Sequence, residues 1–475
     1  MNSRARRAIG LRLGLLLAFA LGGCAVGPDF VAPEAPRQLG YTPQPLLAVD
    51  AGATEPPQQL TPGVAAPRWW RAFGSAELDA TVERALRDSP SVAQAAAALA
   101  QADALARAAT GARAAQIDLG AQASRSRSAG AIGTLDASAF SAGPRVAYDT
   151  DAFGGQRRLI EQQRALAEVQ RAQLDAARQA LAASVVARAL DIAAAREQLA
   201  AVAQLLAVDR DALARVLDAQ GAGAASAADV AAARSQLAGD ETLLPPLRQQ
   251  LAVARDALAV LVGRTPADAP LPSFDVAQLQ LPRQLPLVVP SALVRRRPDI
   301  VAAQAQLHAA SAAIGVASAA LYPQISIDAS WSWQAASAGA LFDQSGLWQL
   351  AASATAPLFH GGTLRAQREA ATAAWRGQLA AYRKTVLGAF AQVADVLQAL
   401  DHDAQLVAAQ RRALDAAETS LRLQQAAWRA GGASYAQVLL AQRAQQQALL
   451  GYARARAQRY LDTAQWFAAT GAPTG

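Results

Sequence analysis

The sequence is poor in the residue types on which most enzyme chemistry depends. Its 475 residues include one cysteine, one methionine and three histidines. The histidines, His308, His360 and His402, lie far apart and show no metal-ligand spacing. The single methionine is the initiator, so thioether ligands for copper(I) are absent. No glycine-rich phosphate loop or nucleophile elbow occurs. We therefore expect no catalytic residues, no metal site and no enzyme activity.

Charge is sparse as well. Charged residues make up 17% of the chain, and the formal net charge is +7. Arg4, Arg6, Arg7 and Arg12 belong to a basic N-terminal stretch, so the rest of the chain carries only about +3. No basic patch with interleaved aromatic residues occurs, which argues against nucleic acid as a partner. Beyond the N-terminus, no run of 18 uncharged apolar residues predicts a membrane-spanning helix.

The basic stretch begins an export signal that ends at the only cysteine. An apolar run at 13–21 is too short to cross a bilayer as a helix, and Gly22, Gly23 and Cys24 follow it. A lone cysteine in an exported chain has no disulfide partner within that chain. The Leu-Gly-Gly-Cys stretch resembles the lipobox of bacterial lipoproteins, where the cysteine receives a diacylglycerol and an N-acyl chain such as palmitate. The alternative is an ordinary signal peptide. By the same resemblance, Ala25 in place of an aspartate implies an outer-membrane destination.

The chain contains two copies of one plan. Similar segments recur in the same order at an offset of 208 residues. The matched pairs are Pro90 with Pro298, Leu99 with Leu307, QIDL (116–119) with QISI (324–327), and GAASAADV (223–230) with GGASYAQV (431–438). A single match is weak in an alanine-rich chain, but the shared order and offset predict a duplication.

Each copy is expected to contain a helix, two strands, a long helix and a shorter helix. In QISIDASWSWQ (324–334), apolar residues such as Ile325 and Trp331 alternate with polar ones, which is the period of a strand with one apolar face. Similar alternation predicts strands at about 115–127, 141–153, 323–335 and 347–359.

The long helices carry a seven-residue apolar repeat, which predicts a left-handed supercoil. The repeat positions are Val185, Ile192, Leu199, Leu206 and Leu213 in the first copy and Leu379, Val386, Val393, Leu400, Val407, Leu414, Leu421 and Trp428 in the second. The helix turns are placed at Gly221, Gly223, Gly431 and Gly432. Ser226 and Ser434 are the expected N-caps of the shorter helices.

These patterns predict how the chain is organised. It comprises a signal peptide (1–23), a lipid-anchored N-terminal strap (24–75), a first repeat (76–264), a linker (265–290) and a second repeat (291–470). The four strands fit a transmembrane barrel wall, but the smallest barrels have about eight strands and lipid tolerates no open edges. Several chains must then share one barrel, and three would supply about twelve strands. The alternative is a periplasmic coiled-coil lipoprotein scaffold that forms no pore.

Six short stretches keep a characteristic order along the chain. They are CAVGPDFVAP (24–33), RWWRAFGSAEL (68–78), FGGQRR (153–158), RRRPDI (295–300), FHGGTLR (359–365) and GASYAQVLLAQ (432–442). Together they resemble outer-membrane efflux ducts of the TolC type, in the OprM-like lipoprotein branch. The resemblance implies a mainly α-helical homotrimer, in which a 12-stranded outer-membrane β-barrel, four strands per chain, stands on a long coiled-coil tunnel in the periplasm.

The resemblance also implies a function and partners. It implies a passive exit duct for small molecules such as drugs, within a tripartite pump that adds a periplasmic adaptor and an inner-membrane RND-type transporter. Such a duct has no cofactor besides the lipid on Cys24, and it contacts outer-membrane lipid. Type I protein secretion uses the same fold and is an alternative.

By the same resemblance, the periplasmic end closes at the glycine turns, where acidic rings line an aperture. Asp229 matches an aperture aspartate of the family, or else it is an exposed acid stabilised by its helix N-terminus. In the second copy Gln437 and Leu440 stand where relatives carry acids, and Ala433 replaces an arginine of one relative. The ring charge is reduced, which puts the salt-bridge lock of relatives in question. Closure by Trp428 and Leu440 is the resulting hypothesis.

We make predictions for three further groups of residues. An interfacial aromatic belt, or packing between chains, is expected for Trp331, Trp333 and Trp348. The N-terminal segment is expected to pack on the tube through Trp69 and Trp70, and a solvated helix face is expected at Asp401, His402 and Asp403.

Overall fold

The computed structural model of the chain describes most of the sequence. The described residues are 25–34, 38, 40–44, 48–49, 57–130, 133–268, 272–343 and 345–474. Cys24 and the predicted signal peptide lie outside them. The chain divides into two compact units that each draw on both sequence copies. Unit 1 is Met1–Glu34, Ala97–Arg171 and Ala302–Lys384, and unit 2 is Ala35–Ala96, Ala172–Val301 and Thr385–Gly475.

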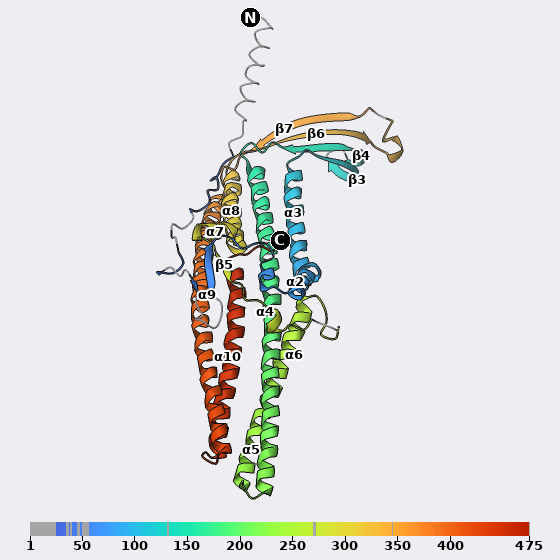
Figure 1. The fold of residues 1–475 in the computed structure, drawn as a ribbon. Helices are drawn as coiled ribbons and strands as arrows, with labels where there is room; N and C mark the ends of the chain where they lie inside the picture. Colours follow the sequence, from blue (N-terminus) through green and yellow to red (C-terminus); the bar gives the residue numbers. More distant parts are fainter. Residues whose placement is uncertain are drawn as a thin grey trace. The chain divides into compact units, whose positions relative to one another are not determined.

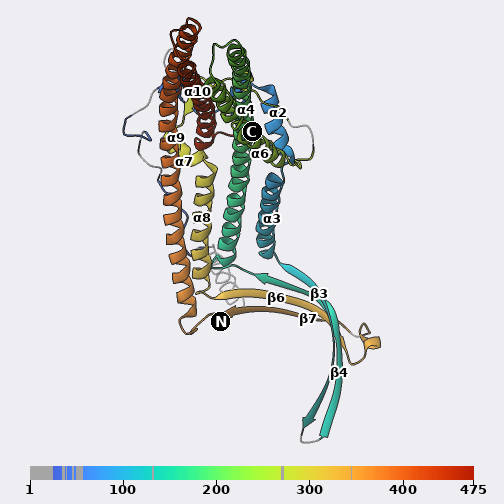
Figure 2. The same cartoon turned by 90° about the horizontal axis from the view of Figure 1, so that it is seen from below.

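Unit 1 contains one curved antiparallel sheet (Figures 1 and 2). Its strands are β3 (Gln116–Gly130), β4 (Gly133–Asp149), β6 (Gln324–Ala335) and β7 (Leu347–Thr355), in the spatial order β3-β4-β6-β7. β4 begins eight residues before the start expected at 141, because it pairs with β3 up to Gly130 opposite Gly133. Among the described residues, β3 and β7 each pair on one side only, so the sheet has two open edges.

The strand register places apolar side chains on one face of all four strands. Ile117 lies opposite Val146, Val146 opposite Ala329, and Ala329 opposite Leu350. Directly paired residues of antiparallel strands point to the same side. This face is uncovered in the single chain, with Ile117 72% and Leu350 66% exposed. A sheet with such a face requires an apolar surrounding or a packed partner.

The opposite face of the sheet is polar. Arg145 and Asp328 form an ion pair between β4 and β6, with Nη2 and Oδ1 2.6 Å apart. The hydroxyl oxygens of Ser326 and Ser353 are 2.8 Å apart across β6 and β7. Apolar and polar residues therefore separate onto the two faces, as in the wall of a membrane barrel around a watery interior.

Aromatic residues gather at the far end of the β6–β7 hairpin. Trp331 lies directly opposite Trp348, and both are exposed. The Trp331 and Trp333 rings meet edge to face at 6.4 Å, and Trp333 meets Phe342 at 5.6 Å. The three tryptophans lie on the apolar side near one end of the strands, a placement that fits an interfacial aromatic belt and equally fits packing between chains.

The long helices bury the apolar positions of the seven-residue repeat. The helices are α3 (Pro90–Ala112), α4 (Gly155–Gly221), α5 (Ala227–Glu241), α6 (Leu244–Leu261), α8 (Pro298–Ala319), α9 (Thr363–Arg429) and α10 (Tyr435–Ala469). Heptad residues of α9 from Val386 to Leu414 are buried, as are Val185, Ile192 and Leu206 of α4. The expected shorter helix of the first copy is divided into α5 and α6, because Pro245 and Pro246 at the start of α6 lack the N–H groups that a continuous helix needs.

The N-terminal strap and the linker form secondary structure together in unit 2. Strand β2 (Gln58–Pro62) pairs antiparallel with β1 (Ala48–Val49) and parallel with β5 (Gln284–Leu287), which lies in the expected linker. The smaller elements are η2 (Trp69–Phe73), α2 (Ala76–Asp88), η3 (Val276–Gln278), α7 (Pro290–Arg296) and, in unit 1, η4 (Ala338–Ala340). Trp69 stacks on Phe467 at 5.2 Å, and the buried Trp70 donates its indole N–H to Asp79 at 2.8 Å. The two tryptophans thus pack this segment on α10 and α2.

One described helix, α8, is long and apolar enough by length and composition to cross a membrane, although the sequence predicts no such helix. It contains Asp299 and His308, and the His308 ring is 2.8 Å from Glu161 of α4. Gly315 lies against the Arg158 side chain, also of α4. Helix α8 is therefore apolar in composition but packs closely on α4, partly through polar contacts.

A substitution at Gly143 tests the strand register of the sheet. A side chain there would collide with the backbone of Trp331 in β6, whereas one at Gly120, the directly paired residue of β3, would meet nothing. We expect Gly143→Val to lower the amount of protease-resistant protein in the membrane fraction at least about tenfold, since a loss of ~1.4 kcal/mol already changes a population tenfold. Gly120→Val is the matched control. Equal yields of the two variants would contradict this register.

Candidate functional site

The two long helices end in equivalent glycine turns in unit 2. Gly223 and Gly431 both adopt left-handed backbone angles, with φ of 74° and 76°. At each turn the N–H of the next residue donates to the carbonyl five residues back, 2.7 Å from Ala224 to Ala219 and 2.8 Å from Gly432 to Ala427. This bond closes a Schellman motif, which needs a glycine-like conformation at one position only. Of the four turn glycines in the sequence, Gly223 and Gly431 meet that need.

The residues after the turns cap the next helices in the same way. The backbone N–H of Ser226 donates to Asp229 at 2.9 Å, and the N–H of Ser434 donates to Gln437 at 3.2 Å. Hydrogen bonds from the Ser226 hydroxyl and N–H lower the pKa of Asp229, which is half-buried and stays ionised. Asp229 thus caps α5 and still presents its charge to solvent, while the equivalent Gln437 caps α10 without charge.

Side chains from both turns meet in one apolar cluster, here called the turn cluster. Its buried members are Val216, Val230, Ala233, Tyr435 and Val438, and Leu213, Ala225, Leu421, Trp428 and Leu439 pack against them. The Trp428 and Tyr435 rings are 5.5 Å apart. The structure therefore joins the ends of α4 and α5 to the ends of α9 and α10.

Leu440 does not belong to the turn cluster. It is 66% exposed, whereas Trp428 is half-buried. The hypothesis of closure by Trp428 and Leu440 thus concerns two unlike positions, one inside the cluster and one free to meet another surface.

A buried polar network follows the turn cluster along α4, α5 and α10. Gln442 donates an amide hydrogen to Oδ1 of Asp209, and Gln446 and Gln236 each donate to Asp240 at 2.7 Å. Arg443 in turn donates to Gln236 at 2.8 Å. All of these residues except Arg443 are buried. The network links α4, α5 and α10 because glutamine amides donate hydrogen bonds to the two aspartates.

The two carboxyl groups of this network lie together, and their proximity favours the protonated form of Asp209. Burial, together with a hydrogen bond to Asp240, raises the pKa of Asp209 to about 7. Oδ2 of Asp209 has no other hydrogen-bond partner among the described residues. A second pair, Asp403 of α9 with Asp462 of α10, has the same character, since burial and the Asp462 carboxyl raise the pKa of Asp403 to about 8. Two like charges in one dry site cannot both stay ionised at low cost.

Neither pair was predicted from the sequence, and the solvated position predicted for Asp403 was wrong. Asp403 is buried rather than on a solvated face, although neighbouring His402 is exposed. A signal was available, because Asp209 and Asp403 each follow a heptad leucine, Leu206 or Leu400, by three residues. That spacing places an acid on the packed side of the helix.

Nothing in the described part of the chain gathers three or more histidine, cysteine, aspartate or glutamate side chains into a group that could hold a metal ion. The described chain has a sheet with one apolar and one polar face, and helical hairpins that meet at the apolar turn cluster, as a membrane channel requires.

This architecture defines the protein class as an outer-membrane channel of the TolC-like fold, and solved structures agree. The outer-membrane channel OprN matches with a TM-score of 0.86 and 24% identity over 95% of this chain and all of that one. A membrane protein from Pseudomonas aeruginosa gives 0.86 at 28% identity, covering 95% and 99%. The open MtrE channel of Neisseria gonorrhoeae gives 0.81 at 24% identity over the same shares.

The chain belongs to the outer membrane efflux protein family, whose profile matches residues 81–264 and 289–472. The second match begins and ends 208 residues after the first, which is the offset of the sequence duplication. The pyoverdine export outer membrane protein OpmQ of Pseudomonas putida is 32% identical over 414 residues, covering 85% of this chain and 87% of the relative. Its Pseudomonas aeruginosa counterpart is 33% identical over 424 residues with the same coverage. The protein is an outer-membrane channel component of an efflux pump.

The raised pKa of Asp209 predicts a pH-dependent stability. The folded state keeps this proton to about pH 7, whereas an unfolded aspartate loses it near pH 4. The stabilisation is complete below the unfolded pKa and is lost as the pH rises through the folded one, by at most about 1.4 kcal/mol per pH unit. We expect the thermal midpoint of the wild type to fall between pH 5 and pH 8, and Asp209→Asn to reduce that fall.

Circular dichroism of the detergent-solubilised protein at the two pH values measures this effect. Asp211→Asn is the matched control, because Asp211 is an exposed residue of the same helix paired with Arg215. An identical pH dependence in the wild type and Asp209→Asn would exclude a raised pKa at Asp209.

Proposed function

We propose that the protein is a passive exit duct that acts as a lipid-anchored homotrimer in a tripartite efflux pump. A periplasmic adaptor and an inner-membrane transporter of the RND type supply the substrate and the energy. The duct itself performs no catalysis. Its substrates are small organic molecules, since relatives of this chain are named for pyoverdine export, for solvent efflux, for toluene efflux and for antibiotic efflux.

The open edges of the sheet carry the proposal. Unpaired backbone groups at β3 and β7 cannot face hydrocarbon, and a four-stranded sheet is too small to close on itself. Pairing of β7 with β3 of a neighbouring chain removes both edges, and three chains supply about twelve strands. The apolar face then contacts lipid, and the polar face with Arg145 and Asp328 lines the water-filled interior.

The anchor of each chain is Cys24. A lipobox-like stretch precedes it, and a probable outer membrane lipoprotein, SilC of Salmonella typhimurium, is 30% identical to this chain over 194 residues, 40% of this chain. Two or more acyl chains anchor a protein stably, because each buried CH₂ contributes about 0.8 kcal/mol.

The turn cluster forms the periplasmic aperture of the trimer. Three copies of the ionised, half-buried Asp229 give an anionic ring that favours cations, and the uncharged Gln437 keeps the ring charge to one acid per chain at this level. Trp428 holds the turn of α9 against Tyr435, and the exposed Leu440 supplies apolar contact around the axis.

Native mass spectrometry of protein extracted from outer membranes in mild detergent tests the assembly. We expect a trimer in which each chain begins at Cys24 and carries the mass of its acyl chains. A lipidated monomer or dimer would exclude the shared barrel and favour the scaffold function. A trimer without acyl mass would exclude only the anchor.

Single-channel conductance in planar bilayers tests the aperture. Trp428→Ala removes a ring from the turn cluster, and large-to-small changes of this kind cost about 3–5 kcal/mol when the ring is well packed. We expect more frequent opening in Trp428→Ala and in Leu440→Ala, and no change in Leu423→Ala, an exposed leucine of α9 outside the cluster. Wild-type conductance in both variants would refute apolar closure.

A further inference from the structure

The segment that directly follows Cys24 is packed against unit 1. The N–H of Val26 donates to the carbonyl of Phe153 at 3.1 Å. Gly27, with φ of 101°, lies so close to α8 that a Cβ on it would be 2.5 Å from Cα of Gly315. A Cβ on Gly154 would be 2.7 Å from Cα of Ala25. Glycines on both surfaces thus let the backbone of this segment settle between α8 and the start of α4.

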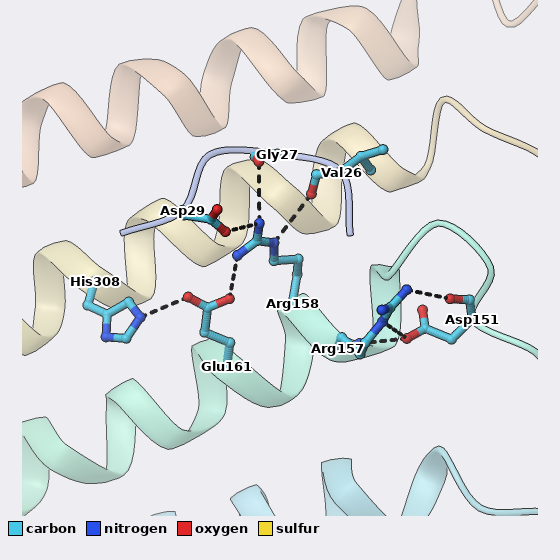
Figure 3. Close-up of polar contacts among 8 residues, drawn as sticks. All are labelled: Val26, Gly27, Asp29, Asp151, Arg157, Arg158, Glu161 and His308. Carbon is cyan, nitrogen blue, oxygen red and sulfur yellow. Dashed lines mark hydrogen bonds and ion pairs between the residues drawn. The ribbon is translucent and has the colours of Figure 1, made fainter. Parts of the chain in front are cut away.

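The side chain of Arg158 in α4 binds the backbone carbonyls of the N-terminal segment (Figure 3). This side chain is 7% exposed. Nε donates to the Val26 carbonyl and Nη2 to the Gly27 carbonyl, both at 3.3 Å, and Nη2 also donates to Asp29 at 2.8 Å. A buried guanidinium needs partners for its donors, and here most partners belong to the N-terminal segment.

Two further side chains complete this site, and Arg158, Glu161 and His308 together are called the clamp. Glu161 accepts from Arg158 at 2.8 Å and lies 2.8 Å from Nε2 of His308 (Figure 3). Although burial opposes it, the hydrogen bonds from Arg158 and His308 lower the pKa of Glu161 and keep the acid ionised. Phe30 stacks on the His308 ring at 4.4 Å with the planes 15° apart.

The clamp is attached to the corner between β4 and α4. Asp151, with φ of 50°, accepts from the N–H groups of Gln156 and Arg157 at 2.7 and 3.0 Å and thereby caps α4. This corner supplies the Phe153 carbonyl and the surface beside Gly154. The docking surface therefore exists only when β4 and the first turn of α4 are folded together.

We propose that the clamp is a docking site for the processed N-terminus of the chain, and that it fixes the acylated Cys24 beside the β4–α4 corner. The proposal rests on the proposed acylation of Cys24. Val26 is two residues from Cys24, so an extended chain puts the two Cα atoms at most about 7 Å apart. The anchor is thus a positioned element that enters the bilayer where the strands end, rather than the end of a loose tether.

Chymotrypsin measures the docking directly. The enzyme cleaves after aromatic residues, and cleavage after Phe30 releases the peptide 24–30 with its lipid, which mass spectrometry detects. A stacked Phe30 resists the enzyme, because a protease needs an extended, free substrate. With the full-length protein extracted from outer membranes in mild detergent, we expect the peptide to be released at least tenfold faster from Arg158→Met than from the wild type.

Two variants separate the clamp from general stability. Arg171→Met is the matched control, because Arg171 forms an exposed ion pair with Glu168 on the same helix; it should release the peptide at the wild-type rate. Gly27→Val disturbs the segment and leaves α4 unchanged, so it should also accelerate release. If Arg158→Met proves generally unfolded, by digestion throughout the chain, Gly27→Val decides. Release at the wild-type rate from Gly27→Val would overturn the proposal.

The mass of the released peptide keeps the two proposals distinct. An acylated peptide released faster from the variants supports both. A peptide that begins at Cys24 without acyl mass refutes the anchor and with it the placement of a lipid, while the release rates still report whether the clamp holds the segment. An acylated peptide released at one rate from all variants refutes the clamp alone.

Discussion

Backbone groups at a sheet edge cannot remain unpaired in hydrocarbon, and most of this architecture depends on that constraint. The four strands of one chain have an apolar face running through Ile117, Val146 and Leu350, and two edges that the chain itself leaves open. Neither feature suits a chain alone in water. Both are consistent with a barrel wall shared between chains. Each sequence copy supplies one hairpin, so one chain has only four strands, which is too few to close a barrel.

The helical part obeys a different rule, in which a seven-residue repeat keeps one stripe of each long helix in contact with its neighbours. Val393, Leu400 and Val407 are fully buried along this stripe. Helices of 67 residues cannot turn back without a break, and the left-handed glycines Gly223 and Gly431 provide it at equivalent positions. The same turns bring four helix ends into the turn cluster.

Polar groups are buried where separate segments of one unit pack together. Arg158 joins the N-terminal segment to the β4–α4 corner, and Asp209 with Asp240 joins α4 and α5 to α10. A buried charge or protonated acid adds little net stability but disfavours alternative arrangements, because each leaves a donor or acceptor unpaired. In α9 and α10, Asp403 and Asp462 repeat this device with different residues, although the two sites are not related by the sequence offset.

The sequence alone determined the features that have a period or a required residue type. The alternation in 324–334, the heptads from Leu379 to Trp428 and the offset of 208 were enough to predict the strands, the long helices and the duplication. The family was predicted separately, from six short stretches that resemble known efflux ducts. Tertiary structure decided what depends on single contacts between distant segments. Three features depend on which segments pack together: the burial of Asp403, the proximity of Asp209 and Asp240, and the hydrogen bond from Arg158 to Gly27. The local sequence around Arg158 does not identify a partner 131 residues away.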